Sequence, residues 1–318
     1  MVQSRDISVT IFFRLKDCCD CMDHGKFKDI LSGFSVTTIT PFSDDLSQVD
    51  IDGISTNTEF LTKNDVPLII PNGNTGEFYS LSEEEWTAVL HATVEASAGK
   101  STIMSGVGHS IKTAVSQLDT VRNIGVSAAM IHYPQHVFSS EEGLFSYYRT
   151  ILQAAKDLNV VLYKKGPLLS DDMLEKLLAY DNLVGVKYAF GRIVDFTRTV
   201  QRLGHKIVWS CGTAERFAPF FFLAGAKAFT SGLCNFAPQV SKRMIDALKK
   251  VDFEEAMKIQ KMITPLEYLR EGRGFANNVP IIKTAMDHVG LKGGLCRPPI
   301  HPLSDEEKNA TIAVISNW

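Results

Sequence analysis

Short, largely apolar segments recur along the chain, and each is followed by a segment with the features of a helix. Apolar runs of this length between turn signals are typical of buried parallel strands. The expected strands occupy residues 33–38, 66–70, 102–107, 128–132, 160–163, 183–187, 207–210 and 228–231. Eight strand–helix units in succession predict an α/β fold, a closed (β/α)₈ TIM barrel. A doubly wound open sheet is the competing architecture, although its usual number of strands is lower.

The length of the chain leaves room for segments outside the eight units. A chain of 318 residues is long for one ordinary domain and typical of one barrel with an extension. We expect residues 1–29 to form an N-terminal extension outside the core and residues 30–238 to form the barrel core. Residues 239–318 would then hold the last barrel helix and a C-terminal helical appendage, with helices at 253–270, 278–289 and 305–316.

The net charge, the apolar stretches and the cysteines limit the partners, the cellular compartment and the metal sites that we expect for this chain. The net charge of -3 gives no electrostatic reason to expect nucleic acid or an anionic membrane, and no apolar stretch approaches the ~20 residues of a membrane span. Cys211, Cys234 and Cys296 stand singly, which is typical of reduced thiols in a cytoplasmic protein. The cysteines within residues 18–21 lie near His24 but lack a second ligand pair at zinc-finger spacing, so no metal site is predicted.

Lys187 ends the sixth expected strand, directly after the apolar residues 183–186. An amine with apolar surroundings is poorly solvated, so its charged form is disfavoured and its pKa falls. A neutral amine attacks a carbonyl group and forms a Schiff base. The alternative is a lysine that leaves the sheet and reaches water, as most lysines do.

The position of Lys187 in a barrel decides between these alternatives. Active sites of (β/α)₈ barrels lie where the strands end and the helices begin. Other candidates fall at the same kind of position: the loop 72–77 after the second strand, residues 132–136 after the fourth, and Tyr163 at the end of the fifth. Their coincidence on one rim favours a functional role for Lys187.

The motifs of this rim occur in a specific order and spacing. The main ones are residues 38–42, 73–77, Tyr163 and 185–187, and weaker ones are 237–238, 297–299 and 302–304. Together they resemble the dihydrodipicolinate synthase and N-acetylneuraminate lyase family of class I Schiff-base aldolases, over nearly everything from residue 33 to the C-terminus. The resemblance implies a (β/α)₈ barrel with C-terminal helices that assembles as a homo-oligomer, a dimer or a tetramer. It also implies catalysis without a metal or an organic cofactor.

The resemblance assigns roles to individual residues. Lys187 corresponds to the lysine that forms an imine with a 2-oxo acid, typically pyruvate. Tyr163 corresponds to the tyrosine that moves protons at the imine carbon. Gly73 and Thr75 correspond to the loop that holds the substrate carboxylate, because glycine lets the backbone come close and threonine adds a hydroxyl. Thr230 corresponds to a residue that lines the site at the end of the eighth strand.

The chain departs from the pattern of the synthases at three places. Asn74 replaces a hydroxyl residue that passes protons to the tyrosine, and an amide is a poor proton carrier. It remains a candidate for substrate binding through hydrogen bonds. Gln135 and His136 stand where the synthases have a pair of tyrosines, one of which reaches the neighbouring subunit's site. His136 either replaces that phenol, since histidine titrates near neutral pH, or is a surface residue.

The third departure concerns the second substrate. Leu168 stands where the synthases place an arginine for the carboxylate of that substrate. Lys164 or Lys165 is a candidate for the missing charge, although lysine is not a bidentate donor. The segments 76–81 and 168–172 are more similar to the ketodeoxyglucarate dehydratase branch of the family.

The leading hypothesis is therefore a cytoplasmic dihydrodipicolinate synthase-like lyase. It would form a Schiff base between Lys187 and a small-molecule 2-oxo acid and catalyse aldol condensation or cleavage. One alternative is a 5-dehydro-4-deoxyglucarate dehydratase-type enzyme that acts on a sugar acid. The other is a barrel that binds a 2-oxo acid without catalysis, which the departures at Asn74, Gln135 and Leu168 motivate.

Overall fold

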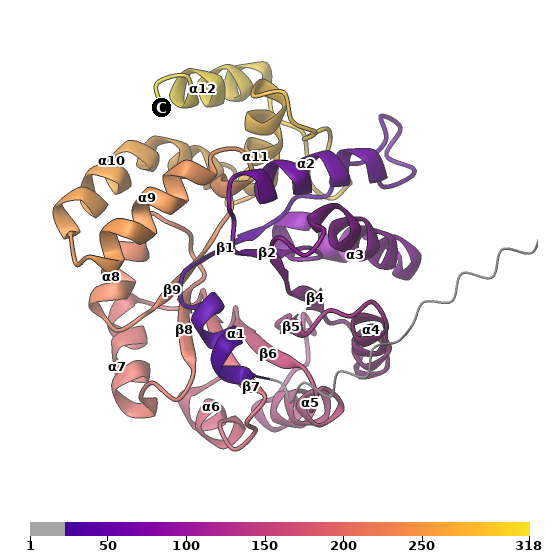
Figure 1. Cartoon of the computed structure of the whole chain (residues 1–318), viewed down its shortest axis with the longest axis vertical. Helices are drawn as coiled ribbons and strands as arrows, with labels where there is room; N and C mark the ends of the chain where they lie inside the picture. Colours follow the sequence, from indigo (N-terminus) through magenta and orange to yellow (C-terminus); the bar gives the residue numbers. More distant parts are fainter. Residues whose placement is uncertain (1–22) are drawn as a thin grey trace, which may run out of the picture.

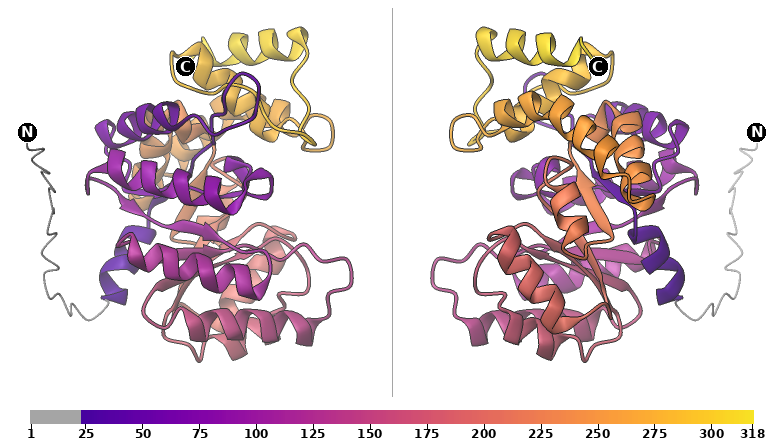
Figure 2. Two further views of the ribbon diagram at one scale, coloured as in Figure 1. Left: turned by 90° about the vertical axis from the view of Figure 1, so that its right-hand side faces the viewer. Right: turned by 90° about the vertical axis from the view of Figure 1, so that its left-hand side faces the viewer.

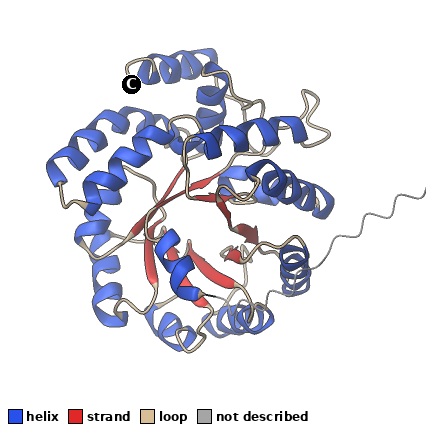
Figure 3. Ribbon diagram, viewed as in Figure 1, coloured by secondary structure: helices blue, strands red, loops and turns tan. Residues whose placement is uncertain are grey.

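The computed structural model describes residues 23–318, and these residues form a barrel of parallel strands surrounded by helices (Figure 1). Figure 3 shows the strands at the centre and the helices outside them. The strands are β1 (Phe34–Thr37), β2 (Leu68–Ile70), β3 (Thr102–Ile103), β4 (Ser105–Val107), β5 (Ala128–Ile131), β6 (Asn159–Lys164), β7 (Leu183–Tyr188), β8 (Val208–Cys211) and β9 (Ala228–Ser231). The predicted (β/α)₈ barrel is confirmed.

The strand order follows the sequence around the barrel. The sheet runs β3-β2-β1-β9-β8-β7-β6-β5-β4, and every pairing in it is parallel. The expected third strand, residues 102–107, is divided at Met104 into β3 and β4. Its backbone nevertheless continues along β2, because the amides of Met104 and Gly106 donate to the carbonyls of Ile69 and Pro71. These bonds close the barrel at the place where the strand order ends.

The helices that cover the barrel are α2 to α9, and each follows a strand as the alternation predicts. They are α2 (Ile51–Lys63), α3 (Glu83–Ser97), α4 (Ile111–Asn123), α5 (Glu141–Ala154), α6 (Asp171–Leu177), α7 (Ile193–Leu203), α8 (Ala218–Leu223) and α9 (Pro238–Lys249). Several begin at a side-chain cap that the sequence supplies. Ser82, for example, accepts from the amide of Glu85, whose carboxylate accepts in return from the Ser82 amide. Such a capping box satisfies two amides of the first turn.

Helix α1 (His24–Leu31) lies across the end of the barrel at which the strands begin (Figures 1 and 2). Phe27 and Leu31 are buried there and pack into the barrel's interior cluster with Val161 and Val184. Residues 24–29, which the sequence analysis places in an extension outside the core, therefore belong to the helix that closes the barrel floor. The cysteines of residues 18–21 lie outside the described residues.

The C-terminal appendage consists of α10 (Phe253–Arg270), α11 (Asn278–His288) and α12 (Asp305–Ile315), in agreement with the three expected helices. Figure 2 shows α11 and α12 stacked beyond one side of the barrel. Helix α10 packs against α9, and α11 contacts the turn that follows β2. The appendage thus reaches the rim where the strands end. Within residues 23–318, no helix has the length and apolar character needed to cross a membrane.

Candidate active site

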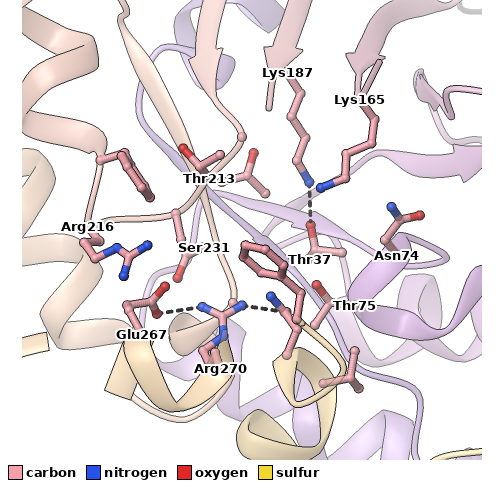
Figure 4. Close-up of a pocket in the computed structure, with 18 of the residues that line it drawn as sticks. Thr37, Asn74, Thr75, Lys165, Lys187, Thr213, Arg216, Ser231, Glu267 and Arg270 are labelled. Atoms are coloured by element: carbon pink, nitrogen blue, oxygen red, sulfur yellow. Dashed lines mark hydrogen bonds and ion pairs between the residues drawn. The ribbon is translucent and has the colours of Figure 1, made fainter. Parts of the chain in front are cut away.

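A cavity of about 380 Å³ opens at the C-terminal ends of the strands. Its inner wall comes from strand ends and from the loop after β2, and its outer wall comes from the β8–α8 loop and the appendage (Figure 4). Lys187, Tyr163, Asn74, Thr75 and Thr230 all line it. Among these five, the side chains farthest apart in the sequence are those at positions 74 and 230, which are separated by 156 residues and meet in one space.

Lys187 stands at the inner end of this cavity, near the end of β7, and its side chain is buried. Its amine lies 3.4 Å from the Thr37 hydroxyl, and within the described chain it forms no ion pair with a carboxylate. Burial, followed by the charge of Lys165, lowers the pKa of Lys187 to about 7. A large share of this amine is therefore neutral and nucleophilic near neutral pH.

Tyr163 is the direct neighbour of Lys187, because the two residues are partners in the register of β6 and β7. The Lys187 amine lies 4.5 Å from the centre of the tyrosine ring. Burial raises the pKa of Tyr163 far above its usual value, and a hydrogen bond from Asn74 opposes part of that rise. The phenol is thus protonated and can donate its proton to a group bound at Lys187.

The loop after β2 forms the cradle next to these two residues. A Cβ atom at Gly73 would lie 2.2 Å from Cγ2 of Thr37, so only glycine lets the loop approach the end of β1 this closely. The turn Asn74–Gly76 follows, and the Thr40 hydroxyl donates to the carbonyl of Gly76. Thr75 is half-buried and presents its polar groups to the cavity. The Thr75 hydroxyl and the amides of a tight turn in this position are suited to bind a carboxylate.

A buried ion pair holds this loop from behind. Glu77 takes a left-handed conformation with φ of 57° directly after the turn, and its carboxylate lies 2.7 Å from the amine of Lys283 on α11. Both side chains are at most 1% exposed. The Arg297 amide also donates to the Glu77 carboxylate. The sequence analysis did not identify Lys283, because nothing in the local pattern connects residue 283 with a loop two hundred residues earlier.

The remaining predicted cations fall on opposite sides of β6. Lys165 lines the cavity, and Figure 4 shows its amine beside that of Lys187. Lys164 points to the other face, where its amine donates to the Leu169 carbonyl and lies 5.4 Å from the centre of the Tyr188 ring. Of the two lysines proposed to supply charge, only Lys165 is therefore in the cavity.

Gln135 and His136 do not line the cavity of Lys187. They lie on the exposed loop after β5 and contribute to a separate cavity of about 610 Å³, together with Tyr79, His109 and Tyr147. His132, at the start of this loop, is buried. Its Nε2 donates to the Asn72 carbonyl at 2.9 Å, and burial lowers its pKa to about 4. It is thus neutral and structural.

The outer wall of the cavity carries charged residues that the sequence analysis missed: Arg216, Glu267, Arg270 and Glu271, with Asn278 beside them. Four of these five come from the appendage, which a search restricted to strand ends does not reach. Their only sequence signal is the density of charge at the end of α10. Within residues 23–318, no group of three or more metal-ligating side chains occurs.

Comparison with known proteins agrees with the fold and with the predicted family. The model of the dihydrodipicolinate synthetase family matches residues 30–318. A probable 5-dehydro-4-deoxyglucarate dehydratase of Bacillus subtilis is 29% identical over 87% of this chain and 91% of its own length. A 4-hydroxy-tetrahydrodipicolinate synthase of Methanothrix thermoacetophila is also 29% identical, over 85% of this chain and 91% of its own length.

A solved structure is more similar still. The crystal structure of dihydrodipicolinate synthase from Oceanobacillus iheyensis is 38% identical to this chain, with a TM-score of 0.89 over 93% of this chain and 99% of that one. These relatives carry names from two activities, a synthase and a dehydratase, so the names alone do not choose a substrate.

Proposed function

We propose that this chain, which belongs to the dihydrodipicolinate synthetase family, is a lyase that forms a Schiff base between Lys187 and a 2-oxo acid. The observation that carries the proposal is the buried Lys187 amine, 4.5 Å from the Tyr163 ring centre, with a pKa lowered to about 7. A lysine without this environment would be protonated at neutral pH and unable to attack a carbonyl.

The arrangement supports a specific sequence of steps. The carboxylate of the 2-oxo acid binds at Thr75 and the amides of the loop, which brings its keto carbon to the Lys187 amine. The amine attacks this carbon, the C–N bond forms, and the carbonyl oxygen leaves as water after accepting protons, one of them from Tyr163. The resulting protonated imine withdraws electrons from the neighbouring carbon, which loses a proton to give an enamine.

A second function, dehydration of a sugar acid, is favoured over condensation with aspartate semialdehyde by two observations. Leu168 replaces the arginine that the synthases use, and it packs against the hydrophobic core. Lys165 is instead the cation beside the imine lysine. In this reaction the enamine expels a hydroxyl group from the neighbouring carbon of the substrate chain. The C–O bond breaks, and the leaving oxygen takes a proton, which the protonated Tyr163 can donate, so that water is released.

Borohydride trapping tests the proposed chemistry. Incubation with pyruvate and borohydride is expected to add the mass of the reduced pyruvate imine to one peptide, the one that contains Lys187, and Lys187→Met is expected to abolish the adduct. Lys165→Met serves as the matched control, because it removes an amine from the same cavity without removing the nucleophile. An adduct that persists in Lys187→Met would overturn the assignment.

Turnover assays then separate the candidates. Aspartate semialdehyde with pyruvate tests the synthase, 5-dehydro-4-deoxyglucarate tests the dehydratase, and trapping without turnover of either would indicate a barrel that binds 2-oxo acids without catalysis. A cytoplasmic location and assembly as a dimer or a tetramer remain part of this proposal. Three described cysteines, all buried and unpaired, are in keeping with a reducing compartment.

A further inference from the structure

The outer wall of the cavity holds a compact polar group that the proposed chemistry does not use. We call it the outer chamber, and it consists of Thr213, Arg216, Glu267, Arg270, Glu271 and Asn278. Figure 4 shows Arg216, Glu267 and Arg270 on the side of the cavity away from Lys187 and Lys165, with Thr213 nearer to Lys187. An imine at Lys187 would therefore direct the distal part of a longer substrate toward this chamber.

The two arginines of the chamber are held rigidly. Arg270 is 5% exposed, its Nη1 lies 2.6 Å from Glu267, and its Nη2 donates to Asn278 Oδ1 at 2.9 Å. Arg216 is 9% exposed, is paired with Glu271, and lies over the rings of Phe217 and Tyr268. Nitrogen atoms of both guanidinium groups remain without a partner, namely Arg216 Nη1 and Arg270 Nε. A buried donor without a partner is costly.

The fold makes room for Arg270 at a specific point. A Cβ atom at Gly232, just after β9, would lie 2.6 Å from its Nη2 atom. Any other residue at position 232 would displace the guanidinium from the cavity wall. Arg270 therefore occupies a prepared place beside the strand end that carries Thr230, rather than an incidental surface position.

The charges of the chamber indicate the chemistry that it recognises. Two guanidinium groups and two carboxylates cancel, so the chamber offers fixed donors and acceptors side by side without a net charge. Hydroxyl groups both donate and accept, and they match such a surface better than an anion does. Apart from the Lys187 amine, the cation in the cavity without an ion-pair partner among the described residues is Lys165.

We propose that the outer chamber binds the hydroxyl groups of the substrate chain, so that the protein selects hydroxylated 2-oxo acids over short ones such as pyruvate. The inference rests on the proposed Schiff-base function and adds a substrate class to it. A site built to hydrogen-bond hydroxyl groups discriminates strongly against analogues that lack them, because its buried polar groups are then left unpaired.

The test measures the ligand concentration that gives half-maximal borohydride trapping at Lys187. Three probes are compared: pyruvate, the monocarboxylate 2-dehydro-3-deoxygluconate, and the dicarboxylate 5-dehydro-4-deoxyglucarate. Both hydroxylated acids are expected to saturate at concentrations at least about tenfold lower than pyruvate, since even one additional hydrogen bond is worth close to that factor. If the monocarboxylate behaves like pyruvate, the hydroxyl groups are not recognised and the inference is wrong.

Variants locate the effect in the chamber. Glu267→Gln/Arg270→Met removes a neutralising pair together and is expected to weaken trapping by the hydroxylated acids by about 10- to 100-fold, with trapping by pyruvate changed less than about twofold. Arg243→Met/Glu255→Gln is the matched control, because it removes an ion pair of 2.8 Å between α9 and the same helix α10, outside the cavity. This control is expected to leave the half-maximal trapping concentrations of pyruvate and of the hydroxylated acids unchanged.

A second variant keeps the test decisive if the first one does not fold. Thr213→Val removes a single hydroxyl of the chamber without changing the shape of the side chain, and it is expected to weaken trapping by the hydroxylated acids alone. Equal losses for all three probes, or none in either variant, would refute the chamber. Absence of an adduct with all three probes in the unmodified protein would instead refute the Schiff-base function itself.

Discussion

Replacement of Lys283 by methionine is expected to destabilise the protein strongly, because it leaves a buried carboxylate without its counter-ion. The Lys283 amine lies 2.7 Å from Glu77 Oε1, and the two side chains are 1% and 0% exposed. The same amine donates to the Leu295 carbonyl at 2.6 Å, a bond that methionine also removes. Breaking a buried pair by removing one partner costs about 3–5 kcal/mol, and we expect a loss in this range.

Urea unfolding followed by circular dichroism measures this loss as a change in the free energy of unfolding. Lys283→Met/Glu77→Gln removes the charge as well and should recover much of the loss, since a glutamine oxygen can still accept from the Arg297 amide.

The reasoning also predicts a functional effect with a defined control. Because Glu77 directly follows the turn Asn74–Gly76, a loosened carboxylate should weaken pyruvate binding in the trapping assay. Lys308→Met is the control, because its pair with Asp305 spans 3.6 Å at the surface and such pairs contribute less than about 1 kcal/mol. Losses of equal size in Lys283→Met and Lys308→Met would refute the role assigned to the buried pair.

Three further predictions concern the inner cavity. The rate of imine formation should rise as pH increases through about 7 and then level off, because the pKa of Lys187 is lowered to about 7 and only the neutral amine reacts. Lys165→Gln should move the midpoint of this rise to higher pH, because it removes the neighbouring charge that lowers the pKa of Lys187. An unmoved midpoint would exclude that effect of Lys165. Tyr163→Phe should lower turnover by about 10²–10⁴-fold with a much smaller effect on KM, measured by steady-state kinetics. Gly73→Ala should destabilise the chain by about 1–3 kcal/mol in urea, because its Cβ would lie 2.2 Å from Thr37 Cγ2, and adding Thr37→Ser, which removes that methyl group, should reverse the loss.

The fold was largely predictable because each strand–helix unit has a local signature. The expected strand 183–187 and the observed β7 (Leu183–Tyr188) differ by one residue, since a continuous apolar run is fully buried in a parallel barrel. The division of the third strand at Met104 had no such signal. The floor helix α1 was also not predicted, because its two apolar anchors, Phe27 and Leu31, are too few to distinguish a helix from an irregular extension.

The inner half of the site followed from one rule of barrel geometry. Parallel strands end on the same rim, so residues close to the ends of β6 and β7 must be neighbours once their register is set. Tyr163 and Lys187 are such a pair. The rule places residues on the rim but does not say to which side of a strand each side chain points. The sequence analysis therefore offered both Lys164 and Lys165 as the missing cation. In the structure, alternation of side chains along the strand directs Lys164 away from the cavity and leaves Lys165 in it.

The outer half of the site depends on contacts that no local pattern specifies. Glu267 and Arg270 are three residues apart on α10, where a pair of opposite charges usually marks a solvated helix face. Here the same pair is buried, because α10 packs on α9 and the segment that follows returns across the rim. In the structure, Gly232, directly after β9, leaves the space that the Arg270 guanidinium occupies. A glycine at this position does not specify which distant residue fills that space, because the partner is set only when α10 packs on α9.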